Sequence, residues 1–271
     1  DTGLPLIVSL GYSAAEIAQL APRVQPFADA LELSTHYIGD DAGPMIDAIR
    51  AAKDAVDVPV FVKLSPFRDM RAAGEAAARA GADGIVAANS FGPCLGVDAE
   101  TGDLLMGSAE GYGWLSGVGL KPLALRCVFD LARAVDLPII GEGGISRGTD
   151  AVEFLMVGAT AVGVCTAAIL GGPKVYGKIA QEIARWLDGH GYEAPEAVRG
   201  LAVDRWRAQG SRHALSAPTL DVGACTGCGR CETSCVYGAI AVMEQKAVLT
   251  EAYCSACGLC VTRCPVRALH R

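Results

Sequence analysis

The sequence predicts an α/β protein with a (β/α)8 barrel of the TIM type, followed by a small cysteine-rich domain. Three observations support this fold class. Apolar runs typical of strands alternate with helical patterns through the first 190 residues, as in proteins with parallel sheets. Several of these runs end in glycine or polar residues, as barrel strands do where they carry a ligand site. Eight of the eleven cysteines gather in two short runs near the C-terminus.

The barrel is expected from six apolar runs, each followed by a helical pattern. The expected strands are residues 5–10, 28–33, 58–66, 84–90, 137–146 and 160–167. The expected helices are residues 13–24, 43–55, 69–80, 120–134, 148–157 and 174–188. Ser13 and Glu16 have capping-box spacing at the start of the first helix. Gly81 and Gly158 follow helical patterns directly and are expected to be left-handed caps.

A closed barrel needs eight units, and the sequence indicates six. The first two units are missing from this sequence, or another chain supplies them, or the body is an open sheet. The chain begins with Asp1 rather than Met and enters almost at once on an apolar run, which favours a missing N-terminal part. The expected domains are a partial barrel at 1–190, a linker with one short helix at 191–219 and a cysteine-rich domain at 220–271.

Composition narrows the function classes. Hydrophobic residues make up 51% of the chain, yet no apolar stretch reaches the roughly 18 residues that a membrane span requires. The formal net charge is −7 without a basic stripe, which argues against a nucleic-acid partner. The chain does not open with a signal-peptide pattern. Clustered cysteines with ligand spacing indicate metal binding in a reducing compartment, so a cytoplasmic location is expected.

Each cysteine run has the form C-x2-C-x2-C-x3-C, and Pro265 follows the second. This spacing resembles that of bacterial ferredoxins with two [4Fe-4S] clusters, in which the fourth cysteine of each run binds the other cluster. The resemblance implies two crossed ligand sets. Cluster one takes Cys225, Cys228, Cys231 and Cys264, and cluster two takes Cys254, Cys257, Cys260 and Cys235. The alternative is a pair of four-cysteine zinc sites, although zinc sites usually use isolated C-x2-C pairs.

Polar residues and glycines mark a second candidate site at the ends of the barrel strands. Lys63 ends one expected strand, where a lysine is costly unless it serves a ligand or an ion pair. Asn89 and Ser90 end another. Gly143 and Gly144 allow close backbone approach to an anion, and Thr166 with the backbone of Cys165 adds donors, although tight strand–helix packing would also explain the glycines.

Five segments resemble the FMN barrel of the dihydroorotate dehydrogenase family, closest to the pyrimidine-reducing subunit of dihydropyrimidine dehydrogenase. They are FVKLSP (61–66), GADGIVAANS (81–90), SGVGLKPLALRCV (116–128), PIIGEGGIS (138–146) and GATAVGVCTA (158–167). That relative also has a C-terminal domain with two four-iron clusters. The resemblance therefore implies a flavin that exchanges two electrons with a small-molecule substrate and single electrons with the clusters.

The resemblance also implies residue roles. Lys63 would contact the N1/O2 edge of the flavin, and Asn89 would contact the isoalloxazine or the substrate. Ser116 and Gly117 would lie beside the ribityl and phosphate groups. The phosphate cradle would consist of Gly143, Gly144, Cys165 and Thr166.

The sequence departs from the family pattern after the strand ALEL. Ser34 replaces the family's asparagine, Tyr37 replaces its cysteine, and the long loop that carries the proton-transferring cysteine is absent. His36 could supply the proton instead, since histidine titrates near neutral pH, or it could be a surface histidine. Cys94, in the segment FGPCLG, is a second candidate, or it could be an inert thiol.

Two functions follow from these expectations. One is an FMN- and iron–sulfur-dependent oxidoreductase that acts on a C–C bond next to a carbonyl or amide, with catalytic candidates His36, Lys63 and Cys94. The alternative is a non-catalytic electron-transfer subunit of a larger redox complex. Either function implies a redox partner, namely a subunit that handles FAD and NAD(P) or a ferredoxin, and an oligomer or subunit of a complex.

Overall fold

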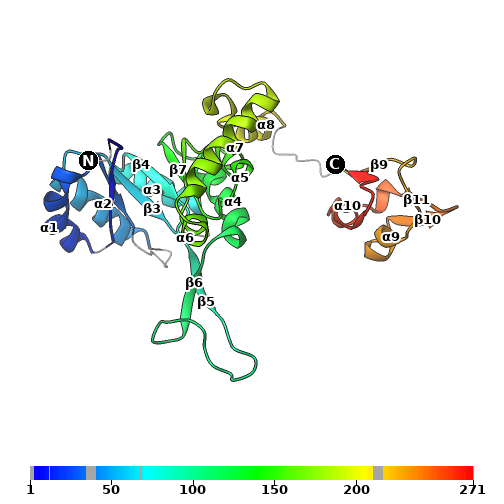
Figure 1. The fold of residues 1–271 in the computed structure, drawn as a ribbon, viewed down its shortest axis with the longest axis horizontal. Coiled ribbons are helices and arrows are strands. Elements are labelled where there is room, and N and C mark those ends of the chain that lie inside the picture. The colour runs from blue at the N-terminus through cyan, green and yellow to red at the C-terminus, as the bar shows by residue number, and fades with distance from the viewer. Residues whose placement is uncertain (1–2, 12, 35–40, 67–68, 210–215, 271) are drawn as a thin grey trace. The chain divides into compact units, whose positions relative to one another are not determined.

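The computed structural model describes residues 3–11, 13–34, 41–66, 69–209 and 216–270. The chain divides into two compact units, Asp1–Arg205 and Trp206–Arg271, and each is described by itself (Figure 1). Within these described ranges, no helix is long and apolar enough to cross a membrane.

A six-stranded parallel sheet forms the centre of the first unit. Its strands lie in the order β1 (Ile7–Leu10), β2 (Ala30–Leu33), β3 (Val60–Leu64), β4 (Gly84–Ala87), β7 (Ile139–Glu142) and β8 (Ala161–Gly163). The expected parallel β/α architecture is confirmed as a curled half-barrel. Among the described residues β1 pairs only with β2 and β8 only with β7, so this sheet is open between β1 and β8.

Helices pack on one face of this sheet and build the main core. They are α1 (Ala14–Val24), α2 (Gly43–Ala55), α3 (Met70–Ala80), α4 (Lys121–Leu131), α5 (Gly148–Met156) and α7 (Lys174–His190). The short helix α6 (Thr166–Gly171) follows β8 and has no buried residue. Alternate strand residues such as Val62 and Leu64 are fully buried against helix residues such as Ile49. Their neighbours Phe61 and Lys63 point to the other, concave face, because successive strand side chains alternate. This face carries the candidate site.

Local signals at the helix ends behave as the sequence predicted. The Ser13 side chain accepts a hydrogen bond from the Glu16 amide, and the Glu16 carboxylate accepts one from the Ser13 amide, so the capping box is confirmed. Gly81 and Gly158 have φ angles of +95° and +112°, as expected for glycines that end a helix.

The segment 91–115, where the sequence predicted neither strand nor helix, contains an antiparallel hairpin. Strands β5 (Phe91–Leu95) and β6 (Tyr112–Leu115) pair with each other and project away from the central sheet (Figure 1). Wide spacing between the two strands in the sequence hid this pairing, since short hairpin loops are the usual signal. The β6 strand leads directly into the loop that precedes η2 (Val118–Leu120) and α4.

Part of the expected linker belongs to the first unit. Residues 195–209 form η3 (Pro195–Val198) and α8 (Leu201–Gln209). Val198 is fully buried in a small core with Leu155 and Leu187, and the Gly200 amide donates to the Leu155 carbonyl oxygen at 2.9 Å. The first unit therefore continues to Arg205 rather than ending near residue 190.

The second unit consists of two short antiparallel ribbons and two single-turn helices. Strand β9 (Thr219–Leu220) pairs with β12 (Leu269–His270), and β10 (Ile240–Met243) pairs with β11 (Lys246–Leu249). Helices α9 (Arg230–Ser234) and α10 (Leu259–Arg263) each contain the third cysteine of one run, and η4 (Glu251–Tyr253) precedes the second run. Glu244 and Gln245 turn the β10–β11 hairpin with φ angles of +48° and +59°.

Candidate functional site

A cavity of about 310 Å³ opens at the carboxyl ends of β3, β4, β7 and β8. Its volume is in the range of small-molecule sites. Polar and small residues predicted from the sequence share its wall with apolar ones that were not predicted. The lining residues are Lys63, Ala88, Asn89, Ser90, Trp114, Ser116, Gly117, Leu120, Glu142, Gly143, Gly144, Ile145, Gly163, Cys165, Thr166 and Ile169.

Lys63 is held between two carboxylates on neighbouring strands of the concave face. Its Nζ lies 2.6 Å from Glu142 Oε2 and 3.9 Å from Glu32 Oε2, and Ser9 donates to Glu32 Oε1 at 2.9 Å. Burial lowers the pKa of Lys63, but the charges of Glu142 and Glu32 raise it by more, so its pKa is raised overall. Lys63 is therefore a cation throughout the neutral pH range.

Glu32 is the more buried of the two carboxylates. Burial raises its pKa, the nearby Lys63 charge opposes this, and the Glu142 charge raises it further, with a net upward shift. The Glu142 carboxylate points to Lys63. Glu32 was not predicted, although a charged residue inside the apolar run ALEL was a signal for it.

Asn89 has an unused donor at the cavity. Its side-chain oxygen accepts from the Ser90 amide at 2.9 Å, while its buried Nδ2 has no hydrogen-bond partner. Buried amide groups are nearly always satisfied, and an unpaired one costs about 1–3 kcal/mol. An amide of this kind at a cavity wall is suited to a ligand acceptor.

Two glycines shape the opposite wall. Gly143 and Gly144 have φ angles of +110° and +84°. A Cβ on Gly144 would lie 2.7 Å from the Gly117 carbonyl oxygen and 2.8 Å from the Lys121 amide nitrogen. Thr166 Oγ1 donates to Ser116 Oγ at 3.0 Å across the same corner. The structure thus brings the predicted phosphate cradle together, and only glycine fits where its loops approach most closely.

An ion-pair network supports this glycine loop from behind. Buried Asp150, in the first turn of α5, accepts from Lys121 Nζ at 2.7 Å and from the Ser146 and Arg147 amides at 3.0 and 3.1 Å. Lys121 also pairs with Glu153 at 2.7 Å. Burial alone would raise the pKa of Asp150, but these bonds, chiefly that from Lys121, lower it to about 2.

The structure describes one of the two predicted proton donors, Cys94. Cys94 lies on β5, its Sγ donates to the Phe91 carbonyl oxygen at 3.5 Å, and it does not line the cavity. His36 lies outside the described residues, as does Tyr37. Trp114, at the base of the hairpin, does line the cavity.

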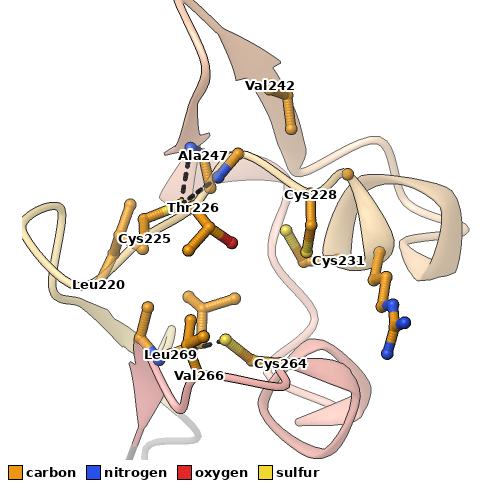
Figure 2. A pocket seen from close by; sticks show the side chains of 14 residues that line it. Leu220, Cys225, Thr226, Cys228, Cys231, Val242, Ala247, Cys264, Val266 and Leu269 are labelled. Atoms are coloured by element: carbon orange, nitrogen blue, oxygen red, sulfur yellow. Dashed lines mark hydrogen bonds between the residues drawn. The ribbon is translucent and has the colours of Figure 1, made fainter.

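The second unit brings four predicted cysteines around one cavity. Cys225, Cys228 and Cys231 from the first run and Cys264 from the second line it, and their side chains point into the shared space (Figure 2). This is the crossed combination expected for cluster one, and the name first cluster site is used for it below. The name second cluster site is used for Cys254, Cys257, Cys260 and Cys235, whose burial matches that of the first set position by position.

Backbone amides point at several of these sulfurs. Cys225 Sγ accepts from the Gly227 and Ala247 amides, both at 3.4 Å (Figure 2). Bonds from Ala247 and Gly227, in that order, lower the pKa of the Cys225 thiol. Amide donors that favour a thiolate suit a metal-bound sulfur.

The cysteine arrangement bears on the zinc alternative. The first cluster site takes three cysteines of one C-x2-C-x2-C run and a fourth from the other run, which is the ligand pattern of a two-cluster ferredoxin. Zinc sites usually use isolated C-x2-C pairs.

Comparison with known proteins identifies both units. Residues 7–187 match the family model described as dihydroorotate dehydrogenase. This chain belongs to the dihydroorotate dehydrogenase family. Residues 224–268 match the model described as a 4Fe-4S dicluster domain. The chain thus carries an FMN-type dehydrogenase domain and a 4Fe-4S ferredoxin domain, as the sequence predicted.

Its curated relatives in this family include several archaeal proteins named dihydroorotate dehydrogenase B (NAD(+)), catalytic subunit. The protein of Methanothermobacter thermautotrophicus is 38% identical over 216 residues, which cover 75% of this chain and 71% of the relative. That of Pyrococcus abyssi is 39% identical, covering 73% and 69%. That of Thermococcus kodakarensis is 40% identical, covering 74% and 69%. These relatives bear out the predicted family at the level of dihydroorotate dehydrogenases, without the narrower assignment to dihydropyrimidine dehydrogenase.

Proposed function

We propose that this chain is the catalytic subunit of an oxidoreductase that interconverts a C–C single bond and a C=C double bond next to a carbonyl or amide. The substrate class is a dihydroorotate- or dihydropyrimidine-like ring. The observation that carries the proposal is the cavity that combines the Lys63 cation, the unpartnered Asn89 amide and a glycine cradle. The name of these relatives, dihydroorotate dehydrogenase B, supports this reaction class.

The chain's residues fit FMN. We infer that Lys63 holds the N1/O2 edge, where a reduced flavin is electron-rich, and that Asn89 Nδ2 donates to the ring or the substrate. Ser116 and Gly117 would lie beside the ribityl and phosphate groups, and Gly143, Gly144, Cys165 and Thr166 would hold the phosphate. When bound, FMN supplies hydride transfer and single-electron transfer.

The partner follows from the same reasoning. We infer two [4Fe-4S] clusters in the tail, one in each cluster site, and therefore about eight irons per chain. Clusters carry single electrons and hold no organic substrate, so they connect the flavin to another redox protein. A subunit that handles FAD and NAD(P) suits this role, and a ferredoxin is the other candidate. The phrase "catalytic subunit" in the relatives' name is consistent with a multi-subunit enzyme.

A relay without catalysis is the second candidate. One observation favours it: Lys63 is already paired with Glu142 at 2.6 Å, and Cys94 is not among the described residues that line the cavity. In that case the flavin site would exchange electrons only with protein partners.

Anaerobic single-turnover kinetics separate the two. The protein, loaded with FMN and clusters, is mixed with excess dihydroorotate or dihydrouracil, and flavin bleaching is followed by absorbance. The reverse reaction uses dithionite-reduced protein with orotate or uracil. Bleaching by either dihydro compound supports catalysis and names the ring. Bleaching by dithionite but by neither dihydro compound supports the relay.

A further inference from the structure

We propose that the two cluster sites are inequivalent, and that the first cluster site holds the electron when the tail carries only one. This inference rests on the two-cluster part of the proposed function. It assigns Lys246 and the Ala247 amide a positioning role in electron transfer. The observations that carry it are differences between equivalent positions of the two halves of the tail.

The halves are related by an offset of 29 residues, which places Cys225 opposite Cys254 in the sequence. Hydrogen bonds follow the same offset. The Ala239 amide donates to Cys235 Sγ at 3.3 Å, and the Ala268 amide donates to Cys264 Sγ at 3.2 Å. Asp221 N to Ala268 O and Thr250 N to Ala239 O are both 2.8 Å. Residues 29 positions apart therefore make equivalent hydrogen bonds in the two halves of the tail.

One pair differs in hydrogen-bonding capacity. Ala247 in β11 donates its amide to Cys225 Sγ at 3.4 Å. Its counterpart one offset earlier is Pro218, just before β9, and both residues are buried. Proline has no N–H, so this position cannot give Cys254 the bond that Ala247 gives Cys225. The bonds from Gly227 and its counterpart Ala256, by contrast, are present in both halves, at 3.4 and 3.3 Å.

Two further pairs differ in charge. The Lys246 ammonium donates to the Cys225 carbonyl oxygen at 2.6 Å, so its charge lies beside the first cluster site. Its counterpart is Ala217. Arg230 lines the cavity of the first cluster site, and its counterpart is Leu259.

The fourth ligands repeat this difference. Cys264, which belongs to the first cluster site, has Arg263 and Arg267 near it in the sequence, whereas Cys235 has Ser234 and Gly238 at the equivalent places. Acidic residues offset this only in part. Asp221, Glu232 and Glu244 lie in the first half, and Glu251 lies beside the second run. Asp221 and Glu232 accept amide hydrogens, from Ala224 at 3.1 Å and from Val242 at 3.1 Å.

These differences should make the reduction potential of the first cluster site the higher of the two. Reduction adds one negative charge to a cluster. Amide bonds to its sulfurs and nearby cations stabilise that charge, so they raise the reduction potential. The first cluster site has one more amide donor by the Ala247–Pro218 difference and a lysine where the second has an alanine. We expect the electron to favour the first site by roughly tenfold, which is about 59 mV for a one-electron couple.

Potentiometric titration of the FMN- and cluster-loaded full chain, followed by EPR, tests this. Native protein should give two cluster waves. Lys246→Met should lower the higher midpoint and leave the lower one unchanged, while Lys246→Arg, which keeps the charge, should retain the native value. The double variant Ala217→Lys, Pro218→Ala should raise the lower midpoint and narrow the gap. The converse variant, Ala247→Pro, would remove the amide donor from the first cluster site. If that variant does not fold, Pro218→Ala still tests the effect of the amide donor on the reduction potential.

Three results would overturn the inference: coincident native midpoints, a Lys246→Met effect on the lower wave, or no response to either set of substitutions. Failure of the proposed function looks different. It would give no four-iron signal at all, or intact cluster signals with neither dihydro compound reducing the flavin.

Discussion

The flavin cavity and the cluster sites are assembled in opposite ways. The cavity takes Lys63, Asn89, Glu142 and Thr166 from four separate strand ends, and Glu32 on a fifth strand pairs with Lys63, so the site exists only when the sheet is formed. The cluster sites are built from a local 29-residue repeat in which each cysteine run contributes three neighbouring ligands. Because its residues come from distant strands, the flavin cavity depends on the packing of the sheet. Because their ligands are close in the sequence, the cluster sites depend on the bound metal. The predictions below test this difference.

The largest effect should come from removing a cluster ligand. Cys225→Ala should halve the iron and acid-labile sulfide, from about eight irons per chain to about four, because a thiolate ligand is lost from one cluster only. Cys235→Ala should remove the other cluster. Cys127→Ala, at a buried core thiol of the first unit, serves as the control and should leave iron unchanged. Two zinc ions without labile sulfide in the native protein would contradict the cluster assignment.

The next effect concerns the cradle. Gly144→Leu should abolish retention of FMN, since a Cβ would meet the Gly117 carbonyl oxygen and the Lys121 amide and the φ of +84° disfavours a side chain. Flavin released by heat and measured by fluorescence checks this. Gly171→Ala, where a Cβ meets nothing within 4 Å, is the matched control. Normal FMN content in the Leu variant would mean that the phosphate binds elsewhere.

The third effect concerns the cation at the cavity. Lys63→Met should lower the flavin reduction potential and slow hydride transfer by about 10²- to 10³-fold, the usual cost of one electrostatic donor. Glu142→Gln should raise the flavin reduction potential, because it releases Lys63 from its 2.6 Å ion pair. Spectroelectrochemistry and stopped-flow absorbance measure both. If neither substitution moves the potential, Lys63 does not face the flavin.

The smallest of these effects is on stability. Asp150→Asn should cost about 2–3 kcal/mol in the free energy of unfolding, because it removes the charge from a buried pair with Lys121. Glu75→Gln, at an exposed pair with Arg79, should change it by less than about 0.5 kcal/mol. Chemical denaturation checks both.

The sign of the Asp150 effect with pH follows from its lowered pKa. The folded-state pKa of about 2 lies below the usual value of 3.8, so the stabilisation is present above about pH 4. It should be lost as the pH falls from about 4 to about 2. Denaturation of native and Asp150→Asn protein should therefore converge at acid pH, and a constant difference across this range would contradict the assignment.

Sequence patterns were most informative where structure is local. The capping box at Ser13, the glycine caps, the parallel β/α order and the crossed cysteine runs all depend on spacing, and spacing is visible in one sequence. The β5–β6 hairpin was not predicted, because its strands pair across a long intervening segment. The role of Glu32 was not predicted, because its partner Lys63 lies 31 residues away in the sequence, on a neighbouring strand.

The turn between β10 and β11 has a practical consequence for handling this protein. Glu244 and Gln245 both occupy the left-handed region, where an ordinary residue costs about 1 kcal/mol and asparagine or glycine far less. A Glu244→Asn, Gln245→Gly variant should therefore make the iron–sulfur domain melt at a higher temperature. Since the Gln245 backbone packs against Gly227, the exchange improves a loop that touches the first cysteine run without altering any ligand. The stability of the iron–sulfur domain can thus be raised at this turn without changing a cluster ligand.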